Sequence, residues 1–81
     1  MDRIAVGQRL RNLRGDRTLD EVAKALGVTS MAVSLWERGE RIPNDDIKIK
    51  ISAYYKTSVT EIFFADLVNR TLTFSSDEDA E

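Results

Sequence analysis

The sequence of 81 residues contains no cysteine and no histidine. The absence of cysteine excludes disulfides and thiolate ligands, which fits a reducing compartment, so we expect a cytoplasmic location. Without these two residue types, the common nucleophile–base pairs of enzymes and the usual zinc sites cannot be built. We therefore expect no enzymatic activity, no metal and no other cofactor.

Long apolar runs are also missing. None approaches the roughly 20 residues that a membrane-spanning helix needs. Nothing resembles a signal peptide, because Arg3 and Arg9 bracket only a short apolar stretch. The four glycines are isolated from one another and form no phosphate-binding loop. These absences argue against a membrane protein and against a nucleotide-binding loop.

The sequence has no excess of basic residues, since 12 Lys and Arg stand against 14 Asp and Glu, a net charge of −2. Domains that bind nucleic acids are more often basic. Four of the acids, however, crowd the last five positions as Asp77, Glu78, Asp79 and Glu81, and residues 1–76 alone carry 12 basic and 10 acidic residues. We expect a mildly basic body and a disordered acidic tail over residues 75–81.

The best-defined pattern is the stretch TLDEVAKALGVTSMAVSLWERG at residues 18–39. Thr18 and Glu21 have the spacing of a capping box, in which a hydroxyl and a carboxylate satisfy donors at the start of a helix. Apolar residues then recur at helical spacing, at Leu19, Val22, Ala23 and Leu26. The pattern predicts a helix over residues 19–26.

A tight corner follows this helix. Gly27 stands where a left-handed C-cap is needed, and Thr29 can cap a second helix over residues 30–38. Val33 and Trp36 form the inward face of that helix, and Gly39 ends it. Two short helices that meet at such a corner are the layout of a helix-turn-helix, whose second helix enters the DNA major groove.

The flanking segments predict three more helices. Residues 2–14 carry an apolar stripe at helical spacing, which the pair Gly15-Asp16 ends. Pro43 places residues 41–44 in a loop. A second capping box, Ser58 with Glu61, opens a short fifth helix.

The stretch from Ile47 to Ile51 alternates apolar and basic residues, as a strand would. The acidic start at Asp45 and Asp46 favours instead a helix over residues 45–56. In that helix Ile47, Ile51 and Tyr55 would face the core, while Lys48 and Lys50 would lie in solvent.

The chain resembles the Cro and lambda-repressor (XRE-like) type of helix-turn-helix regulator over about residues 4–63. The resemblance rests on Thr18, Glu21, Ala23, Leu26, Gly27, Val28, Thr29, Val33, Ser34, Trp36, Glu37, Gly39 and Pro43. The segments VGQRLRNLR at 6–14 and SVTEIF at 58–63 agree with it. It implies an all-α, five-helix lambda-repressor-like DNA-binding domain over residues 1–64, followed by an extension over residues 65–74.

The function that the resemblance implies is a transcriptional regulator, a repressor in our interpretation, whose partner is double-stranded DNA. The positions expected to face base edges are Thr29, Ser30, Met31, Ser34 and Leu35. Phosphate contacts are expected from Thr18, Arg38 and Arg41, and the resemblance pairs Arg14 with Glu37. No Gln, Asn or Arg stands among the base-facing positions, so sequence preference could be modest or depend partly on DNA shape.

Two alternatives stay open. Met31 and Leu35 could form a protein-binding face, as in an antitoxin or an adaptor with a regulatory protein partner. The apolar residues of the segment 62–74 could join two copies into a homodimer, with Phe64, Leu67, Leu72 and Phe74 as the interface. Phe64 and Leu67 could instead fold back onto the helices of one chain.

Overall fold

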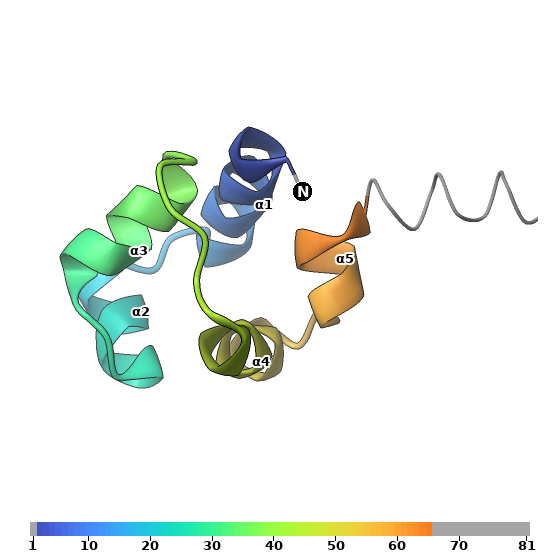
Figure 1. Cartoon of the computed structure of the whole chain (residues 1–81). Coiled ribbons are helices and arrows are strands. Elements are labelled where there is room, and N and C mark those ends of the chain that lie inside the picture. The colour runs from blue at the N-terminus through green and yellow to red at the C-terminus, as the bar shows by residue number, and fades with distance from the viewer. Residues whose placement is uncertain (1, 66–81) are drawn as a thin grey trace, which may run out of the picture.

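The computed structural model describes residues 2–65, which form five helices. They are α1 (Arg3–Arg14), α2 (Leu19–Leu26), α3 (Ser30–Glu37), α4 (Asp45–Tyr55) and α5 (Val59–Phe63). The predicted all-α fold is confirmed, and Ile47 to Ile51 lies in a helix and not in a strand (Figure 1). The expected interface residues Leu67, Leu72 and Phe74 and the acidic tail lie outside the described residues.

A polar side chain caps the start of each of these helices, which explains why the sequence located them well. The caps are Asp2, Thr18, Thr29, Asn44 and Ser58, and each accepts a hydrogen bond of 2.9–3.1 Å from a backbone N–H in the first turn. Such caps satisfy donors that have no partner inside the helix. Asp2 is thus the cap of α1, and the helix begins one residue later than expected.

Three helices end in a left-handed residue. Gly27 closes α2, Gly39 follows α3, and Lys56 closes α4 with φ 55°. In each case the next residue donates to a carbonyl five positions back, for example from Val28 N to Ala23 O at 2.9 Å. This is the Schellman arrangement, in which glycine is the usual left-handed residue. Lys56 adopts it despite its side chain.

The core lies where all five helices converge. Its buried apolar residues are Val6, Leu10, Val22, Ala23, Leu26, Val33, Trp36, Ile51, Ile62 and Phe63. In Figure 1, α2 and α3 form the corner on the left, α4 crosses the bottom, and α5 lies on the right. Ile62 and Phe63 are only 1% exposed within one chain, so the part of the expected dimer segment that contains them cannot be an interface.

Lys48 is buried, at 9% exposure, and the expectation that it lies in solvent is wrong. Its ammonium lies 3.2 Å from the Asp45 carboxylate and 5.8 and 5.5 Å from the ring centroids of Phe63 and Phe64. The two rings, at the end of α5 and directly after it, attract the ammonium charge to their faces. Lys50, by contrast, is exposed as expected.

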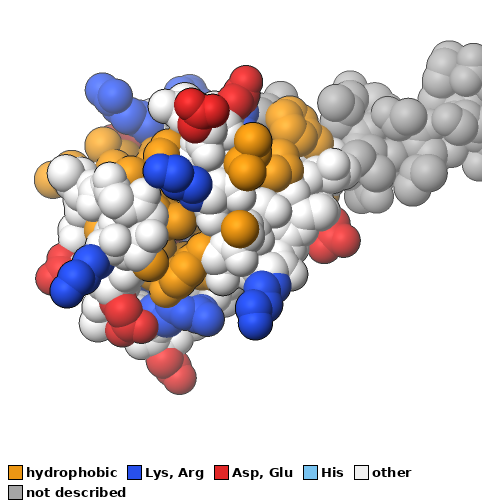
Figure 2. Space-filling model, turned by 90° about the horizontal axis from the view of Figure 1, so that it is seen from below, with side chains coloured by type: hydrophobic (Ala, Val, Ile, Leu, Met, Phe, Trp, Pro, Cys, Tyr) orange, Lys and Arg blue, Asp and Glu red, His pale blue; other side chains and the backbone are white. Residues whose placement is uncertain are grey.

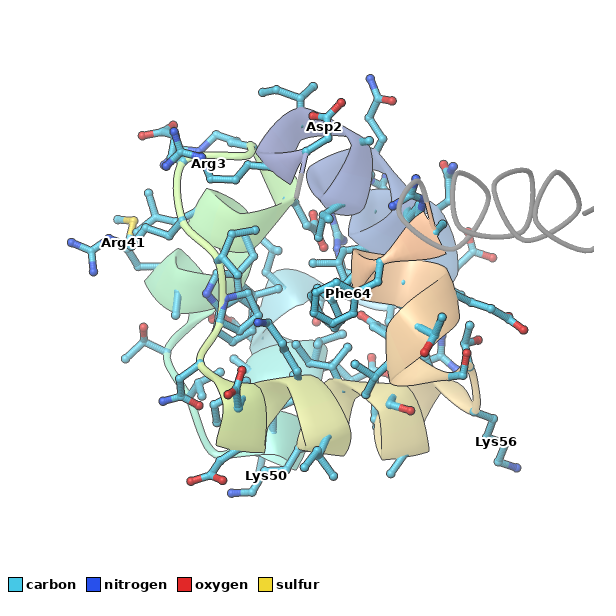
Figure 3. All side chains as sticks on the ribbon, turned by 45° about the vertical axis from the view of Figure 1, so that its right-hand side comes forward. Asp2, Arg3, Arg41, Lys50, Lys56 and Phe64 are labelled. Atoms are coloured by element: carbon cyan, nitrogen blue, oxygen red, sulfur yellow. The ribbon has the colours of Figure 1, made fainter. Side chains whose placement is uncertain are left out.

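Phe64 is half-buried and packs against the core cluster, and its ring points into the molecule (Figure 3). This is the fold-back arrangement that the sequence left open for this residue. Within the described residues, Phe64 therefore helps to cover the core of its own chain.

Candidate DNA-binding site

The corner between α2 and α3 is built from local interactions. The Thr18 hydroxyl accepts from Glu21 N at 3.0 Å, and the Thr29 hydroxyl accepts from Ala32 N at 3.1 Å. Gly27 lies between the two helices with φ 71° and ψ 33°. The geometry is that of a helix-turn-helix, in which α3 is the second helix.

One face of α3 is held tightly against α1. Val33 and Trp36 are buried on it. A Cβ atom added to Gly7 of α1 would lie 2.4 Å from the Glu37 carbonyl oxygen and 2.8 Å from that of Trp36. Gly7 is therefore needed for this close approach, a requirement that spacing along the sequence did not reveal.

Arg14 and Glu37 join the ends of α1 and α3. Arg14 Nε donates to Glu37 Oε2 at 2.7 Å and a terminal nitrogen donates to Oε1 at 3.0 Å. A third donor reaches the carbonyl of Arg17 at 2.8 Å. The hydrogen bond to Glu37 raises the pKa of the Arg14 guanidinium above its ordinary value. A forked pair of this kind fixes direction as well as distance.

The five residues expected to contact bases differ in their exposure. Met31 is 63% exposed and Thr29 is exposed, whereas Ser30, Ser34 and Leu35 are half-buried. Met31 and Leu35 border a surface hollow that Arg41, Ile42 and Pro43 also line. The outward face of α3 therefore combines hydroxyl groups with apolar surface.

The Ser30 hydroxyl donates a hydrogen bond to Asp20 Oδ1, across the corner from α3 to α2. Asp20 was not among the expected site residues, since its place in the first turn of α2 has a sufficient local explanation. The contact joins residues ten positions apart and depends on how the two helices meet.

Cationic groups flank the far end of α3. Arg38 lies 3.2 Å from the Glu40 carboxylate, with both side chains about half exposed, which offsets part of its charge. Arg41 is exposed and projects outward in Figure 3. Arg3 lies nearby, because a Cβ at Gly39 would meet the Arg3 carbonyl oxygen at 3.1 Å. Arg3 was not among the expected site residues, because α1 reaches Gly39 only in the folded chain.

Basic and acidic side chains are interspersed on the face that Figure 2 shows, and neither sign gathers into a single patch. Among residues 2–65, no group of His, Cys, Asp and Glu is arranged to hold a metal ion. None of the five helices in this part of the chain has the length and apolar character that crossing a bilayer would require.

Comparison with known proteins agrees with this geometry. A family model described as "Helix-turn-helix" matches residues 8–62. A solved structure, the clp gene regulator ClgR from Corynebacterium glutamicum, is similar with a TM-score of 0.70 and 26% identity, over 99% of this chain and 87% of that one. No curated protein is significantly similar. The capped corner and the buried inner face of α3 agree with the family match. This chain therefore belongs to the XRE-type helix-turn-helix family and is a DNA-binding transcriptional regulator.

Proposed function

We propose that this protein represses transcription by occupying an operator, with α3 in the major groove. The observation that carries the proposal is the position of α3: one face is locked onto α1 and the core, while Thr29 and Met31 face outward. A rigid helix at the surface can enter a groove without rearrangement. Repression needs only occupancy of a promoter, whereas activation also needs a surface for the polymerase.

The outward groups of α3 suit base edges of more than one kind. Hydroxyl groups of Ser30 and Ser34 can bond to bases, and Met31 and Leu35 can contact the methyl group of thymine. The absence of a bidentate reader among these positions favours a modest sequence preference, to which DNA shape would contribute.

Phosphate contacts would come from the groups around α3. The Thr18 hydroxyl and the backbone N–H groups at the start of α2 could donate hydrogen bonds to one DNA phosphate. Arg41 suits a phosphate of the DNA strand that would run past the end of α3. Arg38 suits the same DNA strand less strongly, because Glu40 offsets part of its charge. We add Arg3 to this set, because α1 brings it beside Gly39.

We further propose a homodimer that joins through the extension after residue 64. The apolar contacts of this homodimer would be Leu67, Leu72 and Phe74, and Phe64 would lie where the extension begins. A two-fold pair would place two copies of α3 on one face of DNA, with half-sites about 10 base pairs, roughly 34 Å, apart or at a multiple of that. Sedimentation of the double variant Leu72→Glu with Phe74→Glu tests the proposal without disturbing the core around Phe64. A wild type that is monomeric at micromolar concentration, or a double variant that still dimerises, would contradict it.

Selection from a random DNA library at moderate salt tests the proposed function. The wild type should enrich one motif, and its footprint on that motif should lie in the major groove. Reporter expression from a promoter that carries the motif should fall when the protein is produced. Enrichment of no motif would reject the function.

The rival is an interaction module such as an antitoxin. It is favoured by Met31, which is exposed, and by the apolar lining of the hollow beside α3. If Met31→Lys abolished binding to a protein partner and left DNA selection unchanged, the rival would be the better account of that surface.

A further inference from the structure

Ser30 is the first residue of α3, and its hydroxyl hydrogen is already used. The hydroxyl donates to Oδ1 of Asp20, which lies in the first turn of α2. An ionised carboxylate only accepts hydrogen bonds, and a serine hydroxyl has a single hydrogen. The oxygen of Ser30 is therefore left with acceptor capacity alone.

We propose that Asp20 is a specificity-determining residue, which acts by fixing Ser30 as a hydrogen-bond acceptor. A serine without such a partner can donate to a base or accept from one, so it discriminates poorly. Ser30 held by Asp20 accepts only from an amino group, which the major groove offers at adenine N6 and cytosine N4. Guanine and thymine present acceptors at the corresponding places and are disfavoured. The inference rests on the proposed reading of DNA by α3.

The neighbouring hydroxyl, that of Thr29, keeps its hydrogen. Thr29 accepts a hydrogen bond from Ala32 N at 3.1 Å, and that bond uses an oxygen lone pair and not the hydroxyl hydrogen. The start of α3 thus presents one hydroxyl that keeps its hydrogen and one that has given it to Asp20. Two adjacent hydroxyl groups, one that can still donate and one that can only accept, can distinguish bases that two interchangeable ones could not.

The charge of Asp20 affects affinity for all DNA and does not by itself contribute to selection. An exposed carboxylate beside the helix that enters the groove repels phosphates and lowers affinity for all DNA. This loss is the same for correct and incorrect sites and cancels from their difference in binding free energy, so any selection comes from the restricted hydrogen bond alone.

The test compares variants in selection from a library with randomised half-sites. Asp20→Ala removes the acceptor, Asp20→Asn removes the charge but keeps an acceptor oxygen, and Ser30→Ala removes the reader. Glu21→Ala and Glu21→Gln are the matched controls, because Glu21 is an exposed acid in the same turn of α2. Thermal unfolding of each variant shows whether the domain stays intact.

We expect one position in each half-site to prefer adenine or cytosine by roughly tenfold in the wild type, the worth of a single good hydrogen bond. Asp20→Ala and Ser30→Ala should each abolish this preference at the same position, and their combination should do no more. Asp20→Asn should retain most of the preference. Both Glu21 variants should retain all of it while they tighten binding at low salt as Asp20→Asn does.

Three results would overturn the inference while the proposed function stands. The first is a motif in which Ser30→Ala alters a position that Asp20→Ala leaves unchanged. The second is a preference for guanine or thymine at that position. The third is a preference for cytosine that survives Ser30→Ala and disappears with Asp20→Ala, because Asp20 would then contact the base itself. A wild type that enriches no motif would reject the proposed function, and this inference with it.

Discussion

Arg14 and Glu37 are 23 residues apart in the chain and meet through two hydrogen bonds of 2.7 and 3.0 Å. Their side chains are only 14% and 8% exposed. Because Glu37 is the last residue of α3, the pair fixes the end of that helix against α1. We infer that it helps to hold α3 at the angle that groove entry requires.

A double-mutant cycle with Arg14→Met and Glu37→Met should show coupling above the roughly 0.2–1 kcal/mol of exposed ion pairs. Either single change leaves the other charge poorly solvated and without its partner. The losses in free energy of unfolding of the two single variants should therefore add up to more than the loss in the double variant. Urea unfolding measures the four free energies. If the changes in free energy of unfolding of the two single variants simply add up to that of the double variant, the two side chains are not coupled.

Gly7→Ala should destabilise the protein by about 1–3 kcal/mol, because the added Cβ would collide with the backbone of Trp36 and Glu37. The sign is informative, since the same change in an unhindered helix stabilises by roughly 0.5–1 kcal/mol. The urea midpoint measures the effect. An unchanged or higher midpoint would show that α1 and α3 do not approach as closely as described.

Lys56→Gly should stabilise the protein by about 0.5–1 kcal/mol, because Lys56 has φ 55° and glycine avoids the cost of a Cβ in that conformation. Lys56→Ala is the matched control: it removes the amine, keeps the Cβ, and should change the thermal midpoint little. If the alanine variant gained as much as the glycine variant, the lysine charge and not the backbone would be the cause.

Tyr55 should make the protein less stable at high pH. Burial, with a smaller contribution from the charge of Glu37, raises the pKa of its phenol from 10.0 to about 12. Below pH 10 the group is protonated in both states, so it adds no pH dependence. Between pH 10 and 12 the unfolded state loses this proton and the folded state keeps it, so stability falls as pH rises. The free energy of unfolding of Tyr55→Phe should fall less across this window than that of the wild type, and parallel curves would contradict the assignment.

Arg41→Ala should weaken binding to all DNA sequences alike and flatten the salt dependence by about one unit, as expected for one lost phosphate contact. Ser34→Ala is the comparison, and it should alter preference at one or two base pairs in each half-site. Binding to the selected motif and to unrelated DNA across a salt series measures both. The assigned roles would be wrong if Arg41→Ala changed base preference and Ser34→Ala did not.

The sequence alone determined where the helices begin and end. Thr18, Thr29 and Asn44 cap their helices through bonds that reach only three residues along the chain. Local bonds of this kind are specified by local sequence, so helix bounds were predicted within one residue for most elements. The family resemblance, which depends on the same local motifs, followed from them.

Apart from the Arg14–Glu37 pair, which the family resemblance implied, only the tertiary structure decided which side chains meet across elements. Lys48 was expected in solvent because periodicity describes one helix, and it is buried because Phe63 and Phe64 arrive from another. Gly7 matters because α3 crosses it, and Ser30 has lost its free hydrogen because α2 brings Asp20 beside it. These contacts join residues ten or more positions apart, and their geometry is set by how the helices pack around the core, which no spacing along the chain encodes.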